Sequence, residues 1–302
     1  MAYVIPARRG ASRRASKRMR PSTPVGEDGE AMTPATPAPA TYIQYARRPL
    51  TGPVVNIAFV NLQDAKLVEG KSNDPKIDLV KELLRFHDGV FIAEVLMNDT
   101  VPSFIYRIQA EVGHTHDFFK TQHLPQGPPG FRHGLFFIGK KSDFETDFYS
   151  SALAVDYVEI PQLRGKERIL AVKHTAGDFL ICGVHLKHGG DARDKELRTQ
   201  AVQTIIENMV GEENGERFLK AGVILGDFNI RPEDANRLVA DGRFTYDQSL
   251  MTTNAKDKVD HYFSRGVQIL RGVIPRDYRG VTPISDHPSI RIRIQKLKGN
   301  KS

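Results

Sequence analysis

The feature that most constrains the fold of this chain is a series of nine short apolar runs that starts at about residue 52. Each run has the length of one buried strand, and several follow one another with only turn residues between them. Many short strands joined in this way are typical of an α/β sandwich, in which sheets pack together and helices lie outside. The predicted strands span residues 54–63, 89–96, 132–140, 154–160, 167–174, 178–186, 222–228, 259–264 and 288–295.

Two of the connecting segments carry a helical pattern. Residues 74–87 begin with Asp74, a capping residue, and Pro75, which suits the first turn of a helix. Residues 191–210 place apolar side chains on a single stripe at helical spacing, which we assign to the core. The stripe consists of Leu197, Ala201, Val202, Ile205, Ile206 and Met209.

The composition divides the chain into a basic tail and a nearly neutral body. Residues 1–50 hold nine Lys and Arg against three acidic residues, so they carry +6 of the net charge of +7. Residues 1–45 combine an Arg-rich block with low-complexity sequence, so we expect a disordered tail or an organelle leader. The predicted folded domain spans residues 52–296, and residues 297–302 form a short basic tail.

The cellular compartment is inferred from apolar stretches and cysteine content. No apolar stretch approaches the roughly 20 residues of a membrane-spanning helix. The Arg-rich start has no apolar segment typical of a secretory signal. Cys182 is the single cysteine, so it cannot form an internal disulfide. We therefore expect an intracellular protein that is not secreted.

The apolar run at residues 223–229, VILGDFN, ends abruptly in polar residues. A carboxylate at the end of a buried strand costs several kcal/mol unless it gains a partner. Asp227 and Asn229 are two residues apart, so on a strand both would point to the same face, opposite to Phe228. A carboxylate beside an amide could hold a metal ion or a phosphate. The alternative is an ordinary turn, where Asp, Asn and Gly are common.

Polar residues end several other predicted strands in the same way. Taken singly, each has an ordinary explanation as a turn residue, a core histidine or a solvated charge. Together they suit a metal-assisted phosphoryl site, because carboxylates bind a hard cation while histidines and amides contact the phosphate. These residues are Asn61, Glu94, His185, Asp260, Asp286 and His287.

In their order along the chain, these residues resemble the motifs of the endonuclease/exonuclease/phosphatase superfamily, whose members include deoxyribonuclease I. The most specific motifs are GDFN at 226–229 and SDH at 285–287. The resemblance covers about residues 52–296. It implies two packed mixed β-sheets flanked by helices, a four-layer α/β sandwich of the DNase I-like type. It also implies a metal-dependent hydrolase of phosphoesters.

The resemblance assigns the metal site to Glu94, with Asp286 and Asn61 completing the surroundings of a divalent cation, Mg²⁺ or alternatively Mn²⁺. It gives Asp227 and Asn229 the task of holding the attacking water and a phosphate oxygen. One metal ion and two are both compatible with the three candidate carboxylates.

The resemblance assigns contact with the scissile phosphate to two histidines. His185 would stabilise charge there or protonate the leaving oxygen. His287 would face the same phosphate, and Asp260 would hold its tautomer by a hydrogen bond to the far ring nitrogen. The proton of the attacking water could pass to either His287 or Asp227.

Some residues depart from the superfamily pattern. Val60 and Ala93 stand where Trp and Gln are frequent, which predicts that one hydrogen bond beside the metal ligand is missing. Abasic-site endonucleases usually carry Asn at the place of His185. Inositol polyphosphate 5-phosphatases usually continue the motif of Asp260 with Trp-Cys-Asp-Arg, which is absent here. Neither branch is therefore favoured.

The segment after His185 adds further polar side chains that could bind a substrate. His188, Arg193 and Arg198 could track a phosphate backbone, and the alternative is a solvated face of an amphipathic helix. The leading hypothesis is a nuclease whose partner is DNA or RNA. The alternatives are a phosphomonoesterase or phospholipid phosphodiesterase of the same fold, and a non-catalytic scaffold in a nucleoprotein assembly.

Overall fold

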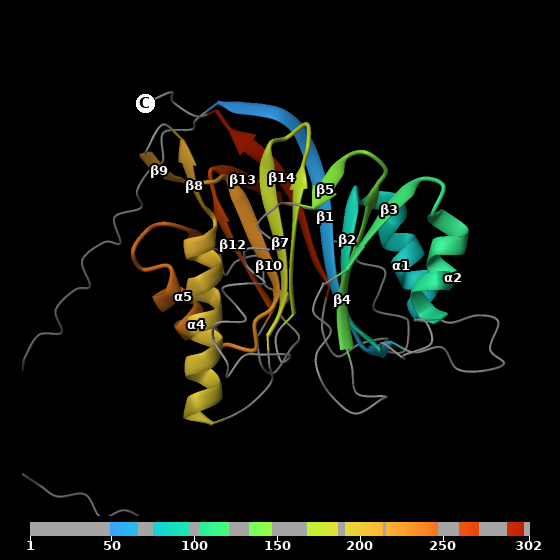
Figure 1. Ribbon diagram of the computed structural model, residues 1–302, viewed down its shortest axis with the longest axis horizontal. Coiled ribbons are helices and arrows are strands. Elements are labelled where there is room, and N and C mark those ends of the chain that lie inside the picture. Colours follow the sequence, from blue (N-terminus) through green and yellow to red (C-terminus); the bar gives the residue numbers. More distant parts are fainter. Residues whose placement is uncertain are drawn as a thin grey trace, which may run out of the picture. The chain divides into compact units, whose positions relative to one another are not determined.

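Two six-stranded mixed sheets pack face to face in the computed structural model of the protein (Figure 1). The structure describes residues 49–65, 75–96, 103–120, 133–146, 168–186, 191–213, 216–246, 260–271 and 289–298. All of these belong to one unit, residues 46–302. The predicted tail at residues 1–45 lies outside the described residues.

Each sheet contains one parallel pair of strands at its centre and antiparallel pairs elsewhere. The first sheet has the spatial order β13 (Val267–Arg271), β14 (Ile290–Leu297), β1 (Leu50–Ala65), β2 (Gly89–Leu96), β4 (His133–Lys140) and β3 (His116–Lys120). The second has the order β11 (Thr245–Tyr246), β12 (Asp260–Arg265), β10 (Gly222–Asp227), β7 (Phe179–His185), β6 (Arg168–His174) and β5 (Phe144–Thr146). A separate hairpin is formed by β8 (Val210–Glu213) and β9 (Glu216–Leu219).

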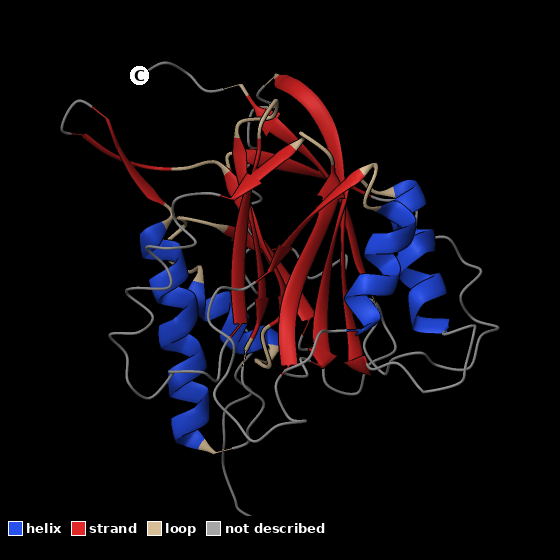
Figure 2. Cartoon of the chain, turned by 45° about the vertical axis from the view of Figure 1, so that its right-hand side comes forward, coloured by secondary structure: helices blue, strands red, loops and turns tan. Residues whose placement is uncertain are grey.

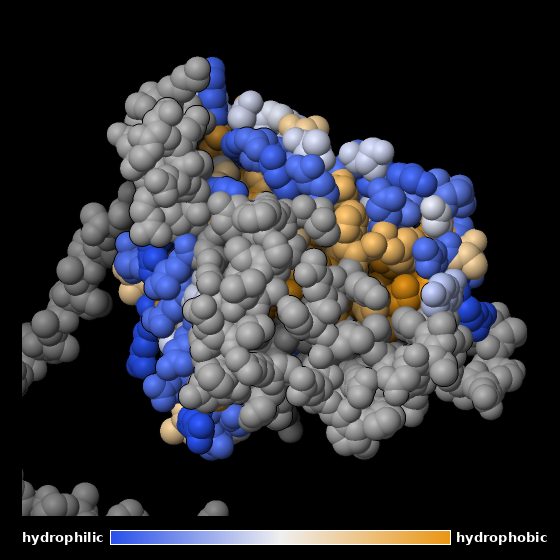
Figure 3. Space-filling model, in the orientation of Figure 1, coloured by the Kyte–Doolittle hydropathy of each residue, from blue (hydrophilic) through white to orange (hydrophobic). Residues whose placement is uncertain are grey.

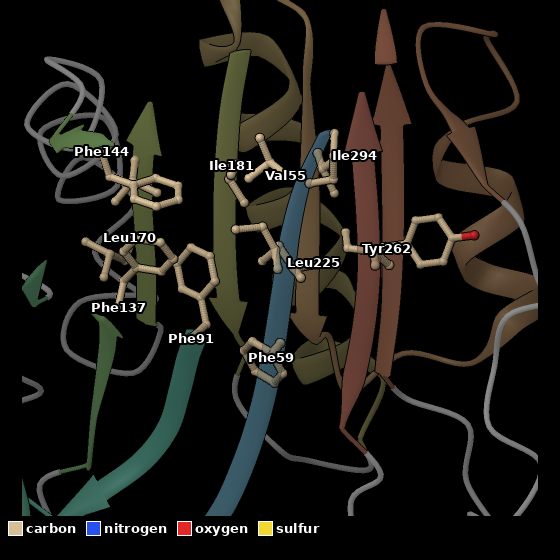
Figure 4. Packing of buried hydrophobic residues seen from close by; sticks show 14 of the residues in the cluster. Val55, Phe59, Phe91, Phe137, Phe144, Leu170, Ile181, Leu225, Tyr262 and Ile294 are labelled. Atoms are coloured by element: carbon tan, nitrogen blue, oxygen red, sulfur yellow. The ribbon is translucent and has the colours of Figure 1, made fainter. Parts of the chain in front are cut away.

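The inner faces of the two sheets share one apolar core (Figure 4). Phe59 of the first sheet and Leu225 of the second are fully buried in it. Phe137 of the first sheet reaches Phe144 of the second, and their rings meet edge to face with centroids 4.9 Å apart. Burial of each such aromatic side chain contributes about 2–3 kcal/mol, so this interface is a main source of stability.

Helices cover the outer faces of both sheets (Figure 2). On the first sheet, α1 (Pro75–Phe86) and α2 (Ser103–Val112) pack against Val60 and Ile92. On the second, α4 (Ala192–Asn208) and α5 (Pro232–Leu238) pack against Ile224 and Phe263. Successive strand residues point to opposite faces, so neighbouring residues pack alternately into the core between the sheets and into the core between a sheet and its helices. The predicted four-layer α/β sandwich is confirmed.

Most predicted elements are present within a few residues of their predicted bounds. Eight of the nine predicted strands match β1, β2, β4, β6, β7, β10, β12 and β14, and the ninth, at 154–160, lies outside the described residues. The helix predicted at 191–210 is α4, capped by Asp191, whose side chain accepts from the backbone N–H of Asp194 at 2.7 Å. All six residues of its predicted apolar stripe are buried. Its outward side is hydrophilic (Figure 3).

Several elements were not predicted, namely α2, α5, β3, β5, β8, β9, β11 and β13. The strands among them are short or lie at sheet edges, where few buried side chains mark them. Gly266, in the left-handed region with φ +62°, joins β12 to β13 and takes the chain from the second sheet to the first. No helix in the described part of the chain is both long and apolar enough to cross a membrane.

Candidate active site

Polar side chains replace the apolar core at one end of the interface between the sheets. Asn61 lies two residues beyond Phe59 in β1, and Asp227 lies two residues beyond Leu225 in β10. Residues two apart on a strand share a face, so both side chains point into the interface. Asn61 is 1% exposed and Asp227 is 2% exposed. At this depth, each polar group requires hydrogen-bond partners.

Asp227 lies between two other predicted site residues. In the second sheet it is aligned with His185 of the parallel neighbour β7 and with Asp260 of the antiparallel neighbour β12. Aligned residues on adjacent strands present their side chains to the same face. The register therefore sets His185, Asp227 and Asp260 in a row along the interface.

Glu94 reaches this place because the backbone of β2 is irregular there. Glu94 has φ +58°, in the left-handed region, and the pairing of β2 with both neighbours shifts register at this point. Regular alternation would put Glu94 on the helix-covered face together with Ile92. A bulge in a strand redirects side chains in this way, and here it brings Glu94 to Asn61. β2 has the predicted bounds, and Glu94 lies two residues before its end at Leu96.

Four of these side chains form one connected polar cluster. The side-chain nitrogen of Asn61 donates to Glu94 Oε1 at 3.1 Å and to Asp227 Oδ2 at 3.2 Å. His185 Nε2 lies 3.3 Å from Glu94 Oε1 and 3.9 Å from Asp227 Oδ2. Two residues come from each sheet, and the cluster therefore depends on the packing of the sheets.

Asn229 lies beyond the end of the strand, in a turn, which is one of the two alternatives that the sequence left open. β10 ends at Asp227, and Asn229 takes a left-handed conformation with φ +49°. Its backbone N–H donates to Asp227 Oδ1 at 3.0 Å, and its side-chain amide donates to the carbonyl of Leu186 at 2.8 Å. Asn229 thereby closes a turn that fixes the Asp227 carboxylate and ties β10 to the end of β7.

Gly226 allows the chain to enter this turn. Its φ of +146° is one that residues with a side chain rarely adopt. A Cβ atom at this position would lie 2.0 Å from the carbonyl oxygen of Val184. The glycine of the GDFN motif is therefore required by close backbone packing beside His185.

The remaining predicted residues lie elsewhere or outside the described residues. Asp286, His287 and His188 belong to segments that the structure does not describe. Arg193 is exposed in the first turn of α4, while Arg198 is 5% exposed on the same helix. The substrate-binding role of both arginines stays a prediction.

Sequence reasoning missed His261, which lies on the opposite face of the second sheet and contacts the segment that follows Asn229. It follows Asp260 in β12, is 1% exposed, and its Nε2 lies 2.7 Å from the carbonyl oxygen of Ile230. Ile230 directly follows Asn229. Strand alternation puts His261 on the helix-covered face together with Phe263. A histidine at an alternating position otherwise filled by apolar residues was the signal in the sequence.

The chemistry of the cluster fits a hard divalent cation. Oxygens of Glu94 and Asp227 approach the same amide nitrogen of Asn61, so two carboxylates lie close together at a buried place. Carboxylate and amide oxygens are ligands of Mg²⁺, and a cation would offset the repulsion between the two acids. In the part of the chain that the structure describes, no three His, Cys, Asp or Glu side chains are grouped as a metal site. The predicted ligand Asp286 lies outside that part.

Comparison with known proteins identifies the fold. No family model and no curated protein sequence matches the chain. An endonuclease/exonuclease/phosphatase family protein from Bacteroides thetaiotaomicron aligns with a TM-score of 0.55 at 14% identity, over 82% of this chain and 99% of that one. Similar alignments are found for ANGEL2, a 2′,3′-cyclic phosphatase, with a TM-score of 0.54 at 12% identity over 82% and 97% of the two chains. The mannosyl-6-phosphatase Bt3783 of the same Bacteroides species gives 0.53 at 14% identity over 80% and 99%. The chain therefore has the DNase I-like fold of the endonuclease/exonuclease/phosphatase superfamily, as the resemblance in its sequence predicted.

Proposed function

We propose that this chain is a phosphoester hydrolase and, within that class, a divalent-metal-dependent nuclease that cleaves DNA or RNA. The observation that carries the proposal is the connected cluster of Asn61, Glu94, His185 and Asp227. Proteins of the same fold support the broader class, because they include a 2′,3′-cyclic phosphatase and a mannosyl-6-phosphatase.

A Mg²⁺ or Mn²⁺ ion would be held by Glu94, with Asn61 and Asp286 beside it. When bound, the cation would neutralise the negative charge of the phosphate, which otherwise repels a nucleophile. Asn61 contributes to the site by holding the carboxylates of Glu94 and Asp227 in fixed positions through two hydrogen bonds. Preorganised groups of this kind stabilise a transition state without reorganising during the reaction.

The other residues of the cluster act on protons and on the phosphate. His185 directs Nε2 toward the two carboxylates, from where it can donate a hydrogen bond to a phosphate oxygen or a proton to the leaving oxygen. Asp227 is oriented by donors on both of its oxygens, Asn229 on Oδ1 and Asn61 on Oδ2. A carboxylate fixed in this way can align a water molecule and accept its proton.

Charge favours nucleic acid as the substrate class. Residues 1–50 carry +6 of the net charge of +7, and Arg193 is exposed in the first turn of the helix that follows β7. Lys and Arg side chains bind the phosphate backbone and make the affinity depend on salt. The reaction itself needs contact with the backbone rather than with particular bases.

The proposal is tested with the purified full chain on single- and double-stranded DNA and RNA, with Mg²⁺, Mn²⁺ or EDTA. A panel of phosphomonoesters and phospholipids is assayed in parallel. We expect cleavage of nucleic acid that requires the divalent cation. Turnover of the small phosphoesters alone would overturn the nuclease assignment and keep the hydrolase class.

Variants of the site residues distinguish activity of this chain from activity of a contaminating nuclease. His185→Ala and Asp227→Asn should each reduce the rate by roughly 10²-fold or more while the chain stays folded, since each removes a group that acts on protons or charge. Glu111→Gln is the matched control, because Glu111 lies on the outer helix α2 and pairs with Lys81. Near-normal cleavage by both site variants would reject the assignment.

A further inference from the structure

A buried histidine and a tyrosine support the active-site turn from behind. His261 lies in β12 and is 1% exposed, next to Asp260 but on the opposite face. Its Nδ1 lies 2.9 Å from the hydroxyl of Tyr246, and its Nε2 lies 2.7 Å from the carbonyl oxygen of Ile230. The two side chains thus connect β11 and β12 to the segment that follows the GDFN motif.

The chemistry of these two contacts fixes the state of the imidazole. A carbonyl oxygen can only accept, so Nε2 of His261 carries the hydrogen and donates it to Ile230. Nδ1 is then an acceptor, and the hydroxyl of Tyr246 donates to it. Burial lowers the pKa of His261 to about 4, so the ring is neutral at physiological pH. Burial also raises the pKa of Tyr246 above its ordinary value, which keeps its hydroxyl protonated.

Ile230 ends a short turn that also contains Asp227 and Asn229 of the site. Asn229 donates from its backbone to Asp227 Oδ1 and from its side chain to the carbonyl of Leu186. The turn is therefore held by hydrogen bonds on two sides, to Leu186 at the end of β7 and to His261 in β12. Two residues of this turn region, Gly226 and Asn229, hold positive φ values, which surrounding contacts must maintain.

We propose that His261 and Tyr246 are positioning residues, which hold the turn Asp227–Ile230 and so keep the Asp227 carboxylate aligned in the active site. The inference rests on the proposed function, because it explains how a residue of that site is placed. The donor at Nε2 acts on Ile230 directly, and Tyr246 acts by fixing the tautomer of His261. Displacement of a reacting group by about 1 Å can cost ~10²-fold in rate.

The test compares two amide replacements of one histidine in the full chain. His261→Gln keeps a donor near the place of Nε2, whereas the shorter side chain of His261→Asn does not reach it. We expect His261→Gln to keep kcat within about threefold, and His261→Asn to lower kcat by about 10–100-fold with KM nearly unchanged. Tyr246→Phe, which keeps the ring contacts, should fall between the two.

The control is a buried histidine away from the site. His87 is 9% exposed, and its Nδ1 lies 2.8 Å from the carbonyl of Leu83 at the end of α1. His87→Gln and His87→Asn should change the thermal midpoint without changing kcat per folded molecule. Loss of kcat in both His261 variants in proportion to their loss of stability would show a purely structural role and overturn the proposal.

A second readout does not depend on activity. Amide hydrogen exchange of residues 227–231, measured by mass spectrometry, should be about tenfold or more faster in His261→Asn than in His261→Gln, while exchange in α1 stays equal. Equal exchange in the turn would overturn the positioning role. If the wild-type chain hydrolyses no phosphoester, the proposed function fails, and this measurement still decides whether His261 holds the turn.

Discussion

The side-chain amide of Asn61 in the first sheet donates a hydrogen bond of 3.2 Å to Asp227 in the second sheet, although 166 residues separate them in sequence. The same amide donates to Glu94, so one side chain positions two carboxylates. This bond joins the two halves of the site across the interface between the sheets. Its loss should therefore affect both stability and catalysis.

Replacement of Asn61 by Leu tests this bond. Asp227 is 2% exposed and would lose a donor, so we expect the free energy of unfolding to fall by about 1–3 kcal/mol. We also expect nucleolytic activity to fall at least tenfold, since both carboxylates lose their alignment. Urea denaturation and the nuclease assay measure the two effects.

Asn56→Leu is the control for this variant. Asn56 lies on the same strand, and its side chain donates to Asp88 at 3.1 Å near the other end of the β1–β2 pair. It should lose stability and keep its activity per folded molecule. Equal loss of activity in both variants would show that the effect of Asn61 is only structural.

Alanine substitution of Gly226 tests the backbone packing at the start of the active-site turn. Gly242, a glycine with positive φ elsewhere in the chain, is the matched control. A methyl group at Gly226 would lie 2.0 Å from the carbonyl oxygen of Val184, whereas Gly242, with φ +75°, has no atom within 4 Å of such a group. Gly242→Ala should cost about 1–2 kcal/mol through its φ alone. Gly226→Ala should cost more than about 3 kcal/mol, as a lower thermal midpoint or loss of folded protein. Equal stability of the two variants would contradict the close packing of β10 against β7.

The charge of Glu94 should determine binding of a divalent cation. Glu94→Gln keeps the shape of the side chain and removes one of two close carboxylates, so the metal-free protein should lose little stability. Wild-type protein should gain thermal stability with millimolar Mg²⁺ or Mn²⁺ by mass action, and the variant should lose most of this gain. Differential scanning fluorimetry measures it, with Glu82→Gln on α1 as control. A cation-induced shift that survives in Glu94→Gln would place the metal elsewhere.

Stability should fall as the pH drops below the ordinary pKa of histidine. Burial lowers the pKa of His261 to about 4, so between about pH 6.5 and pH 4 the unfolded chain takes up a proton that the folded chain does not. The neutral His261 stabilises the folded state fully above about pH 6.5. As the pH falls toward 4, this stabilisation is lost, and the free energy of unfolding decreases by about 3 kcal/mol at most. Burial lowers the pKa of His174 as well, which adds to the same slope.

His261→Gln isolates this contribution, because glutamine does not titrate. Urea denaturation at a series of pH values should give a shallower slope for the variant between pH 6.5 and pH 4 than for the wild type. Parallel curves would show that protonation of His261 does not contribute to acid destabilisation.

Local sequence patterns were sufficient for the elements whose signals lie within a few residues. The stripe of six apolar residues in α4 repeats at helical spacing, and Asp191 caps the same helix. The buried strands β7 and β10 are continuous apolar runs, which need no knowledge of their neighbours. The edge strand β13 was missed because its pairing with β14, rather than its own composition, makes it a strand.

The sequence by itself determined the α/β class, the central strands and, through the GDFN and SDH motifs, the superfamily that the chain resembles. Only the tertiary structure decided that Asn61 meets Asp227, that a bulge turns Glu94 toward them, and that His261 lies behind their turn. The physical reason is the separation in sequence between the residues that determine each feature. Helix periodicity and strand polarity depend on neighbours along the chain, whereas strand register, sheet packing and the direction of a bulged side chain depend on residues far apart in sequence.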